Sequence, residues 1–361
     1  MAGAPTPTLW DPTSAEAQQA EREGVIAIPV PTPFAVGPIN CYLLEDDPLT
    51  LVDSGPNSGP ALDTIERALA ARGHRIEDLE LLVITHQHID HLGLIRILAE
   101  RSGADVAAID VLAPWLARFS RLQEADDAFS EAIMARNGIP EHTRLALLAV
   151  SAAYRGWGAP ATVTRPLRDG ERLELRDRSF DVHLRPGHSP SDTVFHDRER
   201  GMLIGGDHLL AHISSNPLIA RPLADPVQDA ATARDMVRPQ SLRIYLDSLA
   251  ATRAMTGVDL ILPGHGPAIT DYVPLIDERT EHHERRARRI HRLIADRPRT
   301  AFEIAQEIWG KVAITQAYLT LSEVLGHVDL LLNDGLVREE PDGDGVVRFE
   351  SLSPPPARAG A

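Results

Sequence analysis

The sequence predicts an α/β protein in which two mixed β-sheets pack as a sandwich with helices outside. Two observations lead to this prediction. Short apolar runs recur along the chain, for example at residues 81–84, 202–204 and 260–262, and buried strands have this composition. Segments with the spacing of amphipathic helices separate several of these runs, and alternation of strand and helix is typical of α/β layer architectures.

The expected strands form two βαβ-like halves. The first half comprises strands at 26–30, 40–45 and 49–52, a helix at 61–72, and then strand, helix and strand within 79–109. The helix within 79–109 is expected over 92–99. The second half comprises a hairpin of 171–175 with 180–184 and strands at 193–196, 202–204 and 260–262. Together the halves build the predicted sandwich.

The most informative segment follows the strand expected at 81–84. It reads Thr-His-Gln-His-Ile-Asp-His and carries four side chains of metal-ligand type, namely His86, His88, Asp90 and His91. Alternate residues of an extended backbone point to one face, so the first three can converge, and His91 joins them as the chain turns into a helix. Neutral imidazoles and a carboxylate suit zinc, and also iron or manganese. The segment therefore predicts a metal site at a strand end.

Three later strand ends each present one more polar side chain. His188 follows a Pro-Gly turn after the strand at 180–184, and Asp207 follows two glycines after 202–204. His265 follows a second Pro-Gly pair after 260–262. Glycine has no Cβ, so the backbone can pass close to a metal ion there. One such feature is a weak signal, but four in this order predict one site built from separate loops.

With these motifs, the chain resembles the metallo-β-lactamase-fold hydrolases over about residues 26–270. The segment Leu-Val-Asp-Ser-Gly at 51–55 resembles the family's early strand-end aspartate motif, with Ser54 where threonine is usual. The resemblance implies an αββα sandwich with a binuclear site of the glyoxalase II type. It assigns His86, His88 and His188 to one metal ion, Asp90, His91 and His265 to the second, and Asp207 to both. Asp53 would orient a ligand histidine.

The resemblance also implies the cofactors and the chemistry. Two divalent metal ions, zinc foremost with iron or manganese as alternatives, would lower the pKa of a bridging water so that hydroxide forms at neutral pH. Asp90 and Asp207 would orient this hydroxide and take its proton, which makes them the expected catalytic residues. The true β-lactamases keep a cysteine ligand, whereas the single cysteine here, Cys41, lies far upstream. We therefore expect no antibiotic-degrading role.

Residues 111–160 form an insertion between the first metal motif and His188. Trp115, Phe119 and Leu122 share one helical face, and a further helix is expected over 141–155. One interpretation is a helical cap that folds over the site and shapes an apolar pocket. The alternative is a peripheral element for packing or dimerisation. The cap favours a small-molecule ester, thioester or lactone as the substrate.

The character of the sequence changes near residue 298. A short helix is expected from Thr300, which forms a capping box with Glu303, and a longer helix is expected over 315–333. An Asp-Gly turn then joins two strands within 335–349. Helices followed by a hairpin suggest a winged helix, and this tail with the core resembles the winged-helix-tailed branch called the β-lactamase-like protein 2 group. Some members of that branch are endoribonucleases, so a phosphodiesterase is the alternative function.

Charge argues against nucleic acid as a partner. The chain has a net charge of −16, whereas nucleic-acid binding depends on neutralising phosphates with lysine and arginine. Residues 299–361 contain five basic and ten acidic residues, and 315–333 contain no lysine or arginine. We interpret the tail as a packing or dimerisation module, so a homodimer is an expected assembly.

Three weaker candidates remain for contacts with the substrate. Arg285 and Arg289 belong to an arginine cluster on a long helix expected over 272–295. They would clamp an anionic group of the substrate, or else form a solvated face paired with glutamates at i,i+4 spacing. His208, beside Asp207, would contact the substrate or serve the structure. The sequence leaves both choices open.

The expected organisation has four parts. An arm at 1–24 is disordered or extended, a catalytic domain spans 25–297, a winged-helix-like domain spans 298–350, and a disordered tail fills 351–361. No run of about 18 apolar residues predicts a membrane span, and the N-terminus lacks the pattern of a signal peptide. A single cysteine rules out an internal disulfide and fits a reducing cytoplasm.

Overall fold

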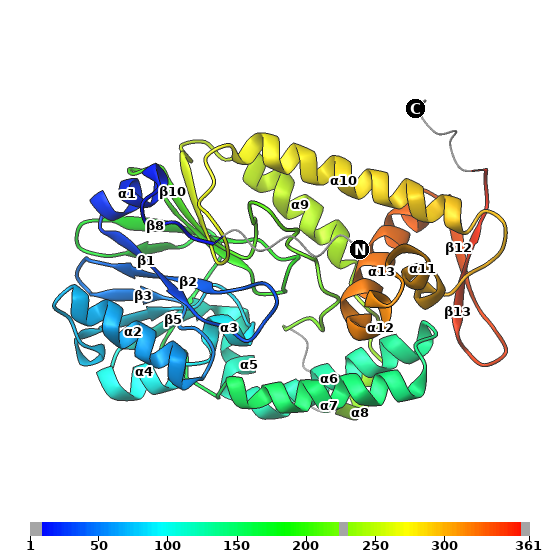
Figure 1. The fold of residues 1–361 in the computed structure, drawn as a ribbon, viewed down its shortest axis with the longest axis horizontal. Coiled ribbons are helices and arrows are strands. Elements are labelled where there is room, and N and C mark those ends of the chain that lie inside the picture. Colours follow the sequence, from blue (N-terminus) through cyan, green and yellow to red (C-terminus); the bar gives the residue numbers. More distant parts are fainter. Residues whose placement is uncertain (1–8, 224–229, 355–361) are drawn as a thin grey trace. The chain divides into compact units, whose positions relative to one another are not determined.

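The computed structural model describes residues 9–223 and 230–354, which divide into two compact units (Figure 1). The first unit takes in the described residues of 1–120, 154–215 and 251–272. The second takes in those of 121–153, 216–250 and 273–361. Each unit is therefore assembled from three separate stretches of chain. The domain division expected at residue 298 stays a prediction.

A sandwich of two sheets forms the first unit, as the sequence predicts. The six-stranded sheet contains, in order, β1 (Val25–Val30), β2 (Ile39–Leu44), β3 (Thr50–Val52), β4 (Leu81–Val83), β5 (Asp105–Ile109) and β6 (Arg165–Leu167). The five-stranded sheet contains, in order, β11 (Leu260–Pro263), β10 (Met202–Gly206), β9 (Thr193–Asp197), β8 (Ser179–Leu184) and β7 (Arg172–Glu174). Both sheets are mixed, because β3 to β6 run parallel and β10 is parallel to β11, whereas the other neighbours are antiparallel.

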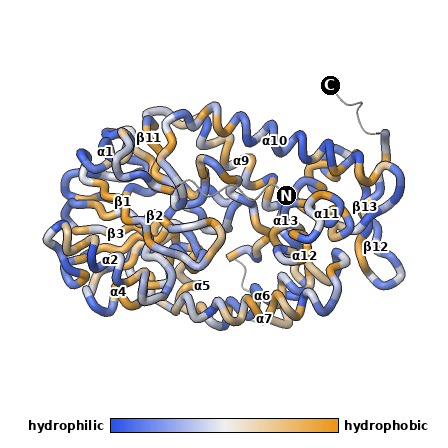
Figure 2. Tube along the Cα trace, viewed as in Figure 1, coloured by the Kyte–Doolittle hydropathy of each residue, from blue (hydrophilic) through white to orange (hydrophobic). Residues whose placement is uncertain are grey.

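Apolar side chains from the two sheets meet in one core. Tyr42 and Val83 of the six-stranded sheet share this core with Phe180, Phe195 and Leu262 of the other. Strands β2, β4 and β11 are buried along their whole length, which matches the uninterrupted apolar composition of β4 and β11, whereas β2 also contains the polar Asn40. Figure 2 shows hydrophobic residues concentrated along β2 and its neighbours β1 and β3. Helices α2 (Gly59–Ala71) and α4 (Ile95–Ser102) lie along the outside of the six-stranded sheet (Figure 1).

The N-terminal arm departs from the expectation. Residues 1–24 were expected to be disordered or extended, but the stretch Ala15–Arg22 forms helix α1. The Ser14 hydroxyl accepts a hydrogen bond from the Ala17 amide at 3.1 Å, which satisfies an amide that the first turn leaves unpaired. Ala20 is buried in the sandwich core and anchors the helix. Residues 1–8, and 355–361 of the expected tail, lie outside the described residues.

The single helix expected after the metal motif is divided into two. Helix α3 (Ile89–Leu92) carries Asp90 and His91, and α4 begins only at Ile95. Gly93 lies between them against the backbone of Asn57 and Trp157, where a Cβ would overlap the backbone atoms. A residue without a side chain is therefore required at this point. This close approach fixes where the metal-binding segment ends.

The second unit is mainly helical and has its own core. Its helices are α6 (Phe119–Arg136), α7 (Glu141–Tyr154), α8 (Ala230–Arg234), α9 (Ser241–Arg253), α10 (Tyr272–Leu293), α11 (Ala301–Trp309), α12 (Val312–Thr315) and α13 (Ala317–Asn333). Four of them, α6, α7, α9 and α10, have one end whose residues belong to the first unit. Phe129 and Ile133 of α6 share a hydrophobic core with Phe302, Leu325 and Phe349. The predicted insertion and the C-terminal segment therefore fold around common apolar contacts.

The C-terminal elements follow the predicted order of helices and then a hairpin. The Glu303 amide donates to the Thr300 hydroxyl at 3.1 Å and the Thr300 amide donates to the Glu303 carboxylate at 2.8 Å, so the capping box is confirmed. Strands β12 (Val337–Pro341) and β13 (Val347–Ser351) pair antiparallel. Classification of this region as a winged helix stays a prediction. Within the described ranges, no helix combines the length and apolar character needed to cross a bilayer.

Candidate metal centre

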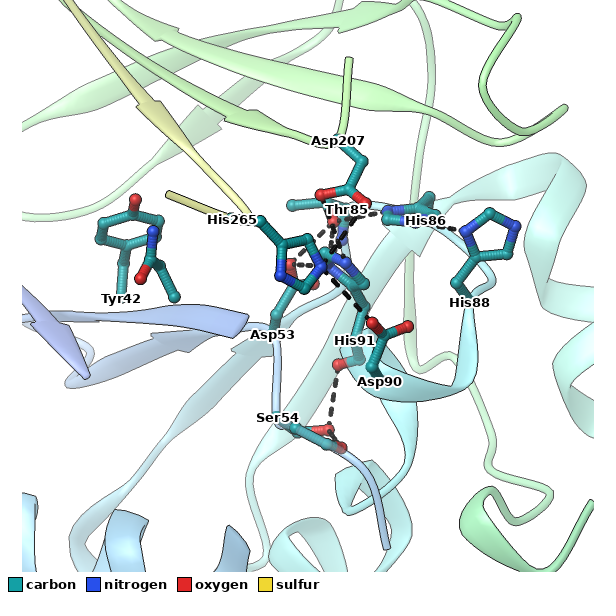
Figure 3. Close-up of polar contacts among 12 residues, drawn as sticks. Tyr42, Asp53, Ser54, Thr85, His86, His88, Asp90, His91, Asp207 and His265 are labelled. Carbon is teal, nitrogen blue, oxygen red and sulfur yellow. Dashed lines mark hydrogen bonds and ion pairs between the residues drawn. The ribbon is translucent and has the colours of Figure 1, made fainter. Parts of the chain in front are cut away.

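All seven predicted ligand residues come together in the first unit. They stand on four loops that follow strands β4, β8, β10 and β11. The loop after β4 belongs to one sheet and the other three loops belong to the second sheet. The residues are His86, His88, Asp90 and His91 after β4, His188 after β8, Asp207 after β10 and His265 after β11. Figure 3 shows six of these side chains directed toward one another.

The first group consists of three histidines. The Nδ1 atom of His88 lies 3.0 Å from Nε2 of His86 and 2.9 Å from Nε2 of His188. Burial lowers the pKa of His88 to about 3, and it also lowers the pKa of His86 well below the ordinary histidine value. Both rings are therefore neutral at physiological pH. Neutral imidazoles offer the lone pairs that bind a metal ion.

The second group consists of Asp90, His91 and His265, and Asp207 lies beside both groups. Nε2 of His265 lies 3.4 Å from Oδ2 of Asp90. One Asp207 oxygen, Oδ1, lies 3.5 Å from Nε2 of His91. The other, Oδ2, lies 3.5 Å from Nε2 of His188 and 3.6 Å from Nε2 of His265. A single carboxylate thus faces a histidine of the first group and two of the second.

Several of these atoms are buried without a hydrogen-bond partner among the described residues. They are Nε2 of His91, Nε2 of His265 and Oδ1 of Asp207. Leaving buried polar atoms unsatisfied costs free energy, so such atoms call for an explanation. Donors of the right type lie within 4.8 Å of one another in each group. Imidazole nitrogens and carboxylate oxygens in this arrangement fit divalent metal ions such as zinc.

The pKa shifts of the second group favour positive charge beside its carboxylates. Burial works against the charged form of His91, yet Asp207 and Asp53 raise its pKa well above the ordinary value. His265 has a raised pKa because Asp207 outweighs burial. Burial likewise opposes the ionised form of Asp207, but His265 and His91 lower its pKa well below the usual range. In the metal-free chain, protons on the two histidines balance the carboxylates, and a bound cation would replace them.

Asp53 holds His91 in place, as the resemblance implies. Its Oδ2 lies 2.7 Å from Nδ1 of His91, so Nε2 of the ring is left for a metal ion. The same carboxylate accepts hydrogen bonds from the amide of Thr85 at 2.9 Å and from its hydroxyl at 2.8 Å. A carboxylate that orients a ligand histidine in this way is a common second layer around zinc.

Sequence reasoning missed the residues that hold the loops. The Tyr42 hydroxyl and the Asn40 amide donate to the carbonyl of Pro263 at 2.7 and 3.0 Å, which positions the backbone just before His265. Nδ1 of His265 itself lies 2.8 Å from the carbonyl of Pro38. The available signal was the presence of Asn and Tyr in a strand that is otherwise apolar. A buried polar side chain needs a partner, so such positions indicate a hydrogen-bonded junction.

The backbone at Gly264 passes very close to the side chains of Asp207 and His91. A Cβ at this position would meet Oδ1 of Asp207 and would lie 2.7 Å from Cε1 of His91. Any side chain there would displace Asp207 of the loop after β10 and His91 of the loop after β4. The glycine before His265 is therefore required by space, as the Pro-Gly pattern in the sequence indicates.

Two of the three weaker candidates, His208 and Arg285, have structural contacts of their own. His208 is buried, its Nε2 lies 2.8 Å from the Thr252 hydroxyl, and burial lowers its pKa to about 3. Arg285 lies on α10 in the second unit and pairs with Glu281 at 3.1 Å, which confirms the i,i+4 pairing. Arg289 lies one turn further along the same helix. A contact of any of the three with substrate stays a prediction.

Comparison with known proteins identifies the family. The model of the Metallo-beta-lactamase superfamily matches residues 35–265, so the chain belongs to this superfamily. It is similar to Probable metallo-hydrolase YqjP of Bacillus subtilis (strain 168), with 32% identity over 326 residues that cover 90% of this chain and 97% of that protein. Beta-lactamase-like protein 2 homolog of Caenorhabditis elegans is 22% identical over 310 residues, covering 85% and 83%.

A solved structure shows the same fold. The metallo-beta-lactamase family protein TTHA1429 from Thermus thermophilus superposes with a TM-score of 0.74 at 27% identity, covering 91% of this chain and 98% of that one. The predicted α/β sandwich fold is therefore confirmed. The assignment to a glyoxalase II type of site and to the winged-helix-tailed branch stays a prediction.

Proposed function

We propose that this protein is a metal-dependent hydrolase that cleaves an ester, thioester or lactone of a small molecule. The observation that carries the proposal is the convergence of two ligand groups on one buried carboxylate, Asp207. The name of the Bacillus relative, a probable metallo-hydrolase, supports the same class of reaction.

The ligand roles follow the grouping in the structure. His86, His88 and His188 would hold one divalent ion, Asp90, His91 and His265 the second, and Asp207 both. Zinc is the first choice because of the imidazole-rich donor set, with iron or manganese as alternatives. When bound, the metal pair would supply Lewis acidity and a water molecule of lowered pKa.

The chain's own groups orient this water and accept its proton. Asp90 and Asp207 offer carboxylate oxygens at the point where the two groups meet. A carboxylate within hydrogen-bonding reach of the attacking water can serve as a general base. Asp53 and Thr85 keep the His91 ring in one orientation while this happens. The acid–base residues are thus Asp90 and Asp207.

Three aromatic side chains favour an apolar acyl group in the substrate. Phe34 makes an edge-to-face contact with Tyr154 at 5.5 Å between ring centroids, and Trp157 lies 6.3 Å from Phe34 by the same measure. Phe34 belongs to the loop before β2 whose Pro38 carbonyl contacts His265. The carbonyl of Trp157 accepts the Asn57 amide at 2.7 Å, close to the metal-binding segment. These rings are only partly buried, so they offer an apolar surface beside the centre.

A phosphodiesterase is the second candidate. It is supported by the likeness to Beta-lactamase-like protein 2 homolog and by the helices and hairpin of the tail. Arginines of the tail are paired, however, since Arg338 contacts Glu350 at 2.6 Å and Arg348 contacts Glu303 at 3.2 Å. Paired arginines leave little charge for phosphates, and the chain carries −16 overall. We therefore rank the acyl substrate first. A small molecule as the partner, a homodimer and a cytoplasmic location remain predictions.

The decisive test is turnover by metal-loaded protein on thioesters, lactones, aryl esters and a phosphodiester, each with and without EDTA. We expect chelator-sensitive cleavage of acyl substrates only. Asp207→Ala should reduce this turnover at least about a hundredfold, the scale on which single groups stabilise a transition state. Asp63→Ala removes an exposed carboxylate of α2 and serves as the matched control. Equal turnover by the two variants would refute the site, and cleavage of the phosphodiester alone would favour the second candidate.

A further inference from the structure

A second cluster of side chains of metal-ligand type lies in the second unit. Its residues all come later in the sequence than those of the first centre. His283 stands on α10, and Glu323 and His327 stand one turn apart on α13. One ligand atom from each residue lies within 4.8 Å of the other two. Both histidines are almost fully buried, with exposed fractions of 1% and 0%. The cluster joins two helices that are far apart in the chain.

The spacing of the two rings is close to that of the candidate ligand histidines in the first centre. Nδ1 of His283 lies 3.1 Å from Nε2 of His327. The corresponding distances to Nδ1 of His88 are 3.0 and 2.9 Å. Two nitrogens bound to one tetrahedral zinc ion at about 2.0–2.1 Å are about 3.3 Å apart. The His283–His327 pair is therefore set close to the geometry of a shared cation.

Hydrogen bonding prepares His327 to act as a ligand. Its Nδ1 donates to the carbonyl of Glu323 at 2.6 Å, so in the neutral ring Nε2 carries a lone pair. This is the arrangement that orients ligand histidines in metal sites. Burial lowers the pKa of His327 and of His283 to about 4, so both rings are neutral at physiological pH.

A simple hydrogen bond between the two rings would leave Nε2 of His283 without a partner. Its Nε2 is buried and has no hydrogen-bond partner among the described residues. If the two rings share only a hydrogen bond, Nδ1 of His283 carries its proton and Nε2 is a buried, unpaired acceptor. If Nε2 of His283 carries the proton, the lone pairs of His283 Nδ1 and His327 Nε2 face each other at 3.1 Å. A cation between these two nitrogens would remove the repulsion between the lone pairs. His283 also lines a cavity of about 200 Å³.

We propose that His283, His327 and Glu323 bind a divalent transition-metal ion of the zinc class, separate from the hydrolytic centre. Two imidazoles and a carboxylate provide three ligands, and water completes a tetrahedral set. The ion fastens α10 to α13 and stabilises the second unit, because a ligand that binds only the folded state shifts unfolding by mass action. It takes no part in hydrolysis.

The test is zinc stoichiometry and affinity of the full chain in a background that lacks the first centre. In the variant His88→Ala, His188→Ala, His265→Ala, Asp207→Ala, we expect one tightly bound zinc ion per chain to remain. Adding His327→Gln should remove this ion. Adding Glu323→Gln instead, which leaves both rings in place, should weaken zinc binding at least about tenfold, since even residues that only orient ligands contribute this much. Cobalt in place of zinc should give a tetrahedral absorption spectrum, which His327→Gln abolishes and which needs at least about tenfold more cobalt to develop in Glu323→Gln.

His282→Gln is the matched control, because His282 neighbours His283 but lies outside the cluster. It should keep the ion. Near-ultraviolet circular dichroism of each variant shows whether the fold is intact. If folded His327→Gln and Glu323→Gln bind as much zinc as the control, or if the background variant binds none, the histidines share a hydrogen bond and the proposal is overturned. Neither result depends on whether the chain hydrolyses acyl substrates.

Discussion

Asp53 lies outside the candidate ligand groups but contacts one of their histidines, His91. Its backbone has φ of 60°, a left-handed conformation that is uncommon outside glycine and that aspartate tolerates better than most residues. Such conformations persist where surrounding contacts enforce them. Here the amide of Thr85 and the His91 ring both bind the carboxylate. The strained backbone therefore delivers a carboxylate that cannot turn away from the ring.

Replacing this carboxylate by an amide should loosen the second ligand group. In Asp53→Asn, one oxygen remains to serve both Thr85 and His91, and the added NH₂ group is a donor where acceptors are needed. We expect zinc binding to weaken about 10- to 100-fold, as for other residues that orient ligand histidines. Competition with a chromophoric chelator measures this change. Asp63→Asn is the exposed control, and equal affinities of the two variants would show that Asp53 does not orient the ligand.

At the residue level, the candidate ligands that the structure brings together could be picked out from the sequence, whereas the residues that support them could not. His86, His88 and Asp90 are announced by their alternating spacing after an apolar run. Thr85, Asn40 and Tyr42 act through hydrogen bonds that join distant segments, for example the 2.7 Å bond from Tyr42 to Pro263. No local pattern records such a partner. Only the buried polar position itself gives a hint.

Two short elements border the centre and set what can approach it. The loop before β2 carries Phe34, and the 3-10 helix Arg155–Trp157 carries Trp157. Each element makes a hydrogen bond near the centre. The carbonyl of Pro38 contacts the His265 ring, and the carbonyl of Trp157 accepts from the Asn57 amide. We therefore expect these elements, rather than the ligand loops, to select the substrate. Their aromatic content favours apolar groups.

Truncation of these rings should affect binding more than chemistry. We expect Phe34→Ala and Trp157→Ala each to raise KM about tenfold for substrates with long acyl chains, with kcat little changed, because loss of uniform binding raises KM alone. Acetyl substrates, which do not reach the rings, should show a smaller change. Trp309→Ala removes an aromatic ring of the second unit that stacks on Arg286 and serves as the control. Steady-state kinetics would refute the assignment if long and short acyl substrates responded alike.

Strands are predicted accurately where a continuous apolar run marks a buried strand. Fully apolar strands such as β4 and β11 lie within one or two residues of their expected positions. Helix α9 was missed, although Leu242, Tyr245 and Leu249 mark its buried face. The pattern of an amphipathic helix shows that one face is covered but does not name the covering element. For the same reason, the shared core of the insertion and the tail could not be foreseen.

For the molecule as a whole, metal binding and proton balance are linked. The raised pKa values of His91 and His265 mean that the folded, metal-free chain keeps these protons above the ordinary value of 6.5. Their contribution to stability is complete below that value and is lost as pH rises through the folded-state pKa values. A cation that replaces the protons must release them. Metal affinity should therefore rise with pH.

Calorimetry can count the released protons. We expect zinc binding near pH 7 to release about two protons per chain, one from each raised histidine. Titrations in buffers with different heats of ionisation give this number directly. His291→Gln, which changes a buried histidine of α10 outside both clusters, should leave it unchanged. Absence of proton release at neutral pH would contradict the charge balance described for the second ligand group.

The order of the ligand loops along the chain has a consequence for synthesis. The first ligand group is complete once His188 has left the ribosome, whereas the second requires His265, which follows β11. Because β11 pairs with β10 and completes its sheet, the last ligand arrives only with the last strand of the sandwich. If the centre holds two ions as proposed, we therefore expect a nascent chain to be able to bind the first early and the second only after both sheets have formed. Binding of both ions would then depend on completed folding, and a chain that ends before β11 would lack His265 of the second ligand group.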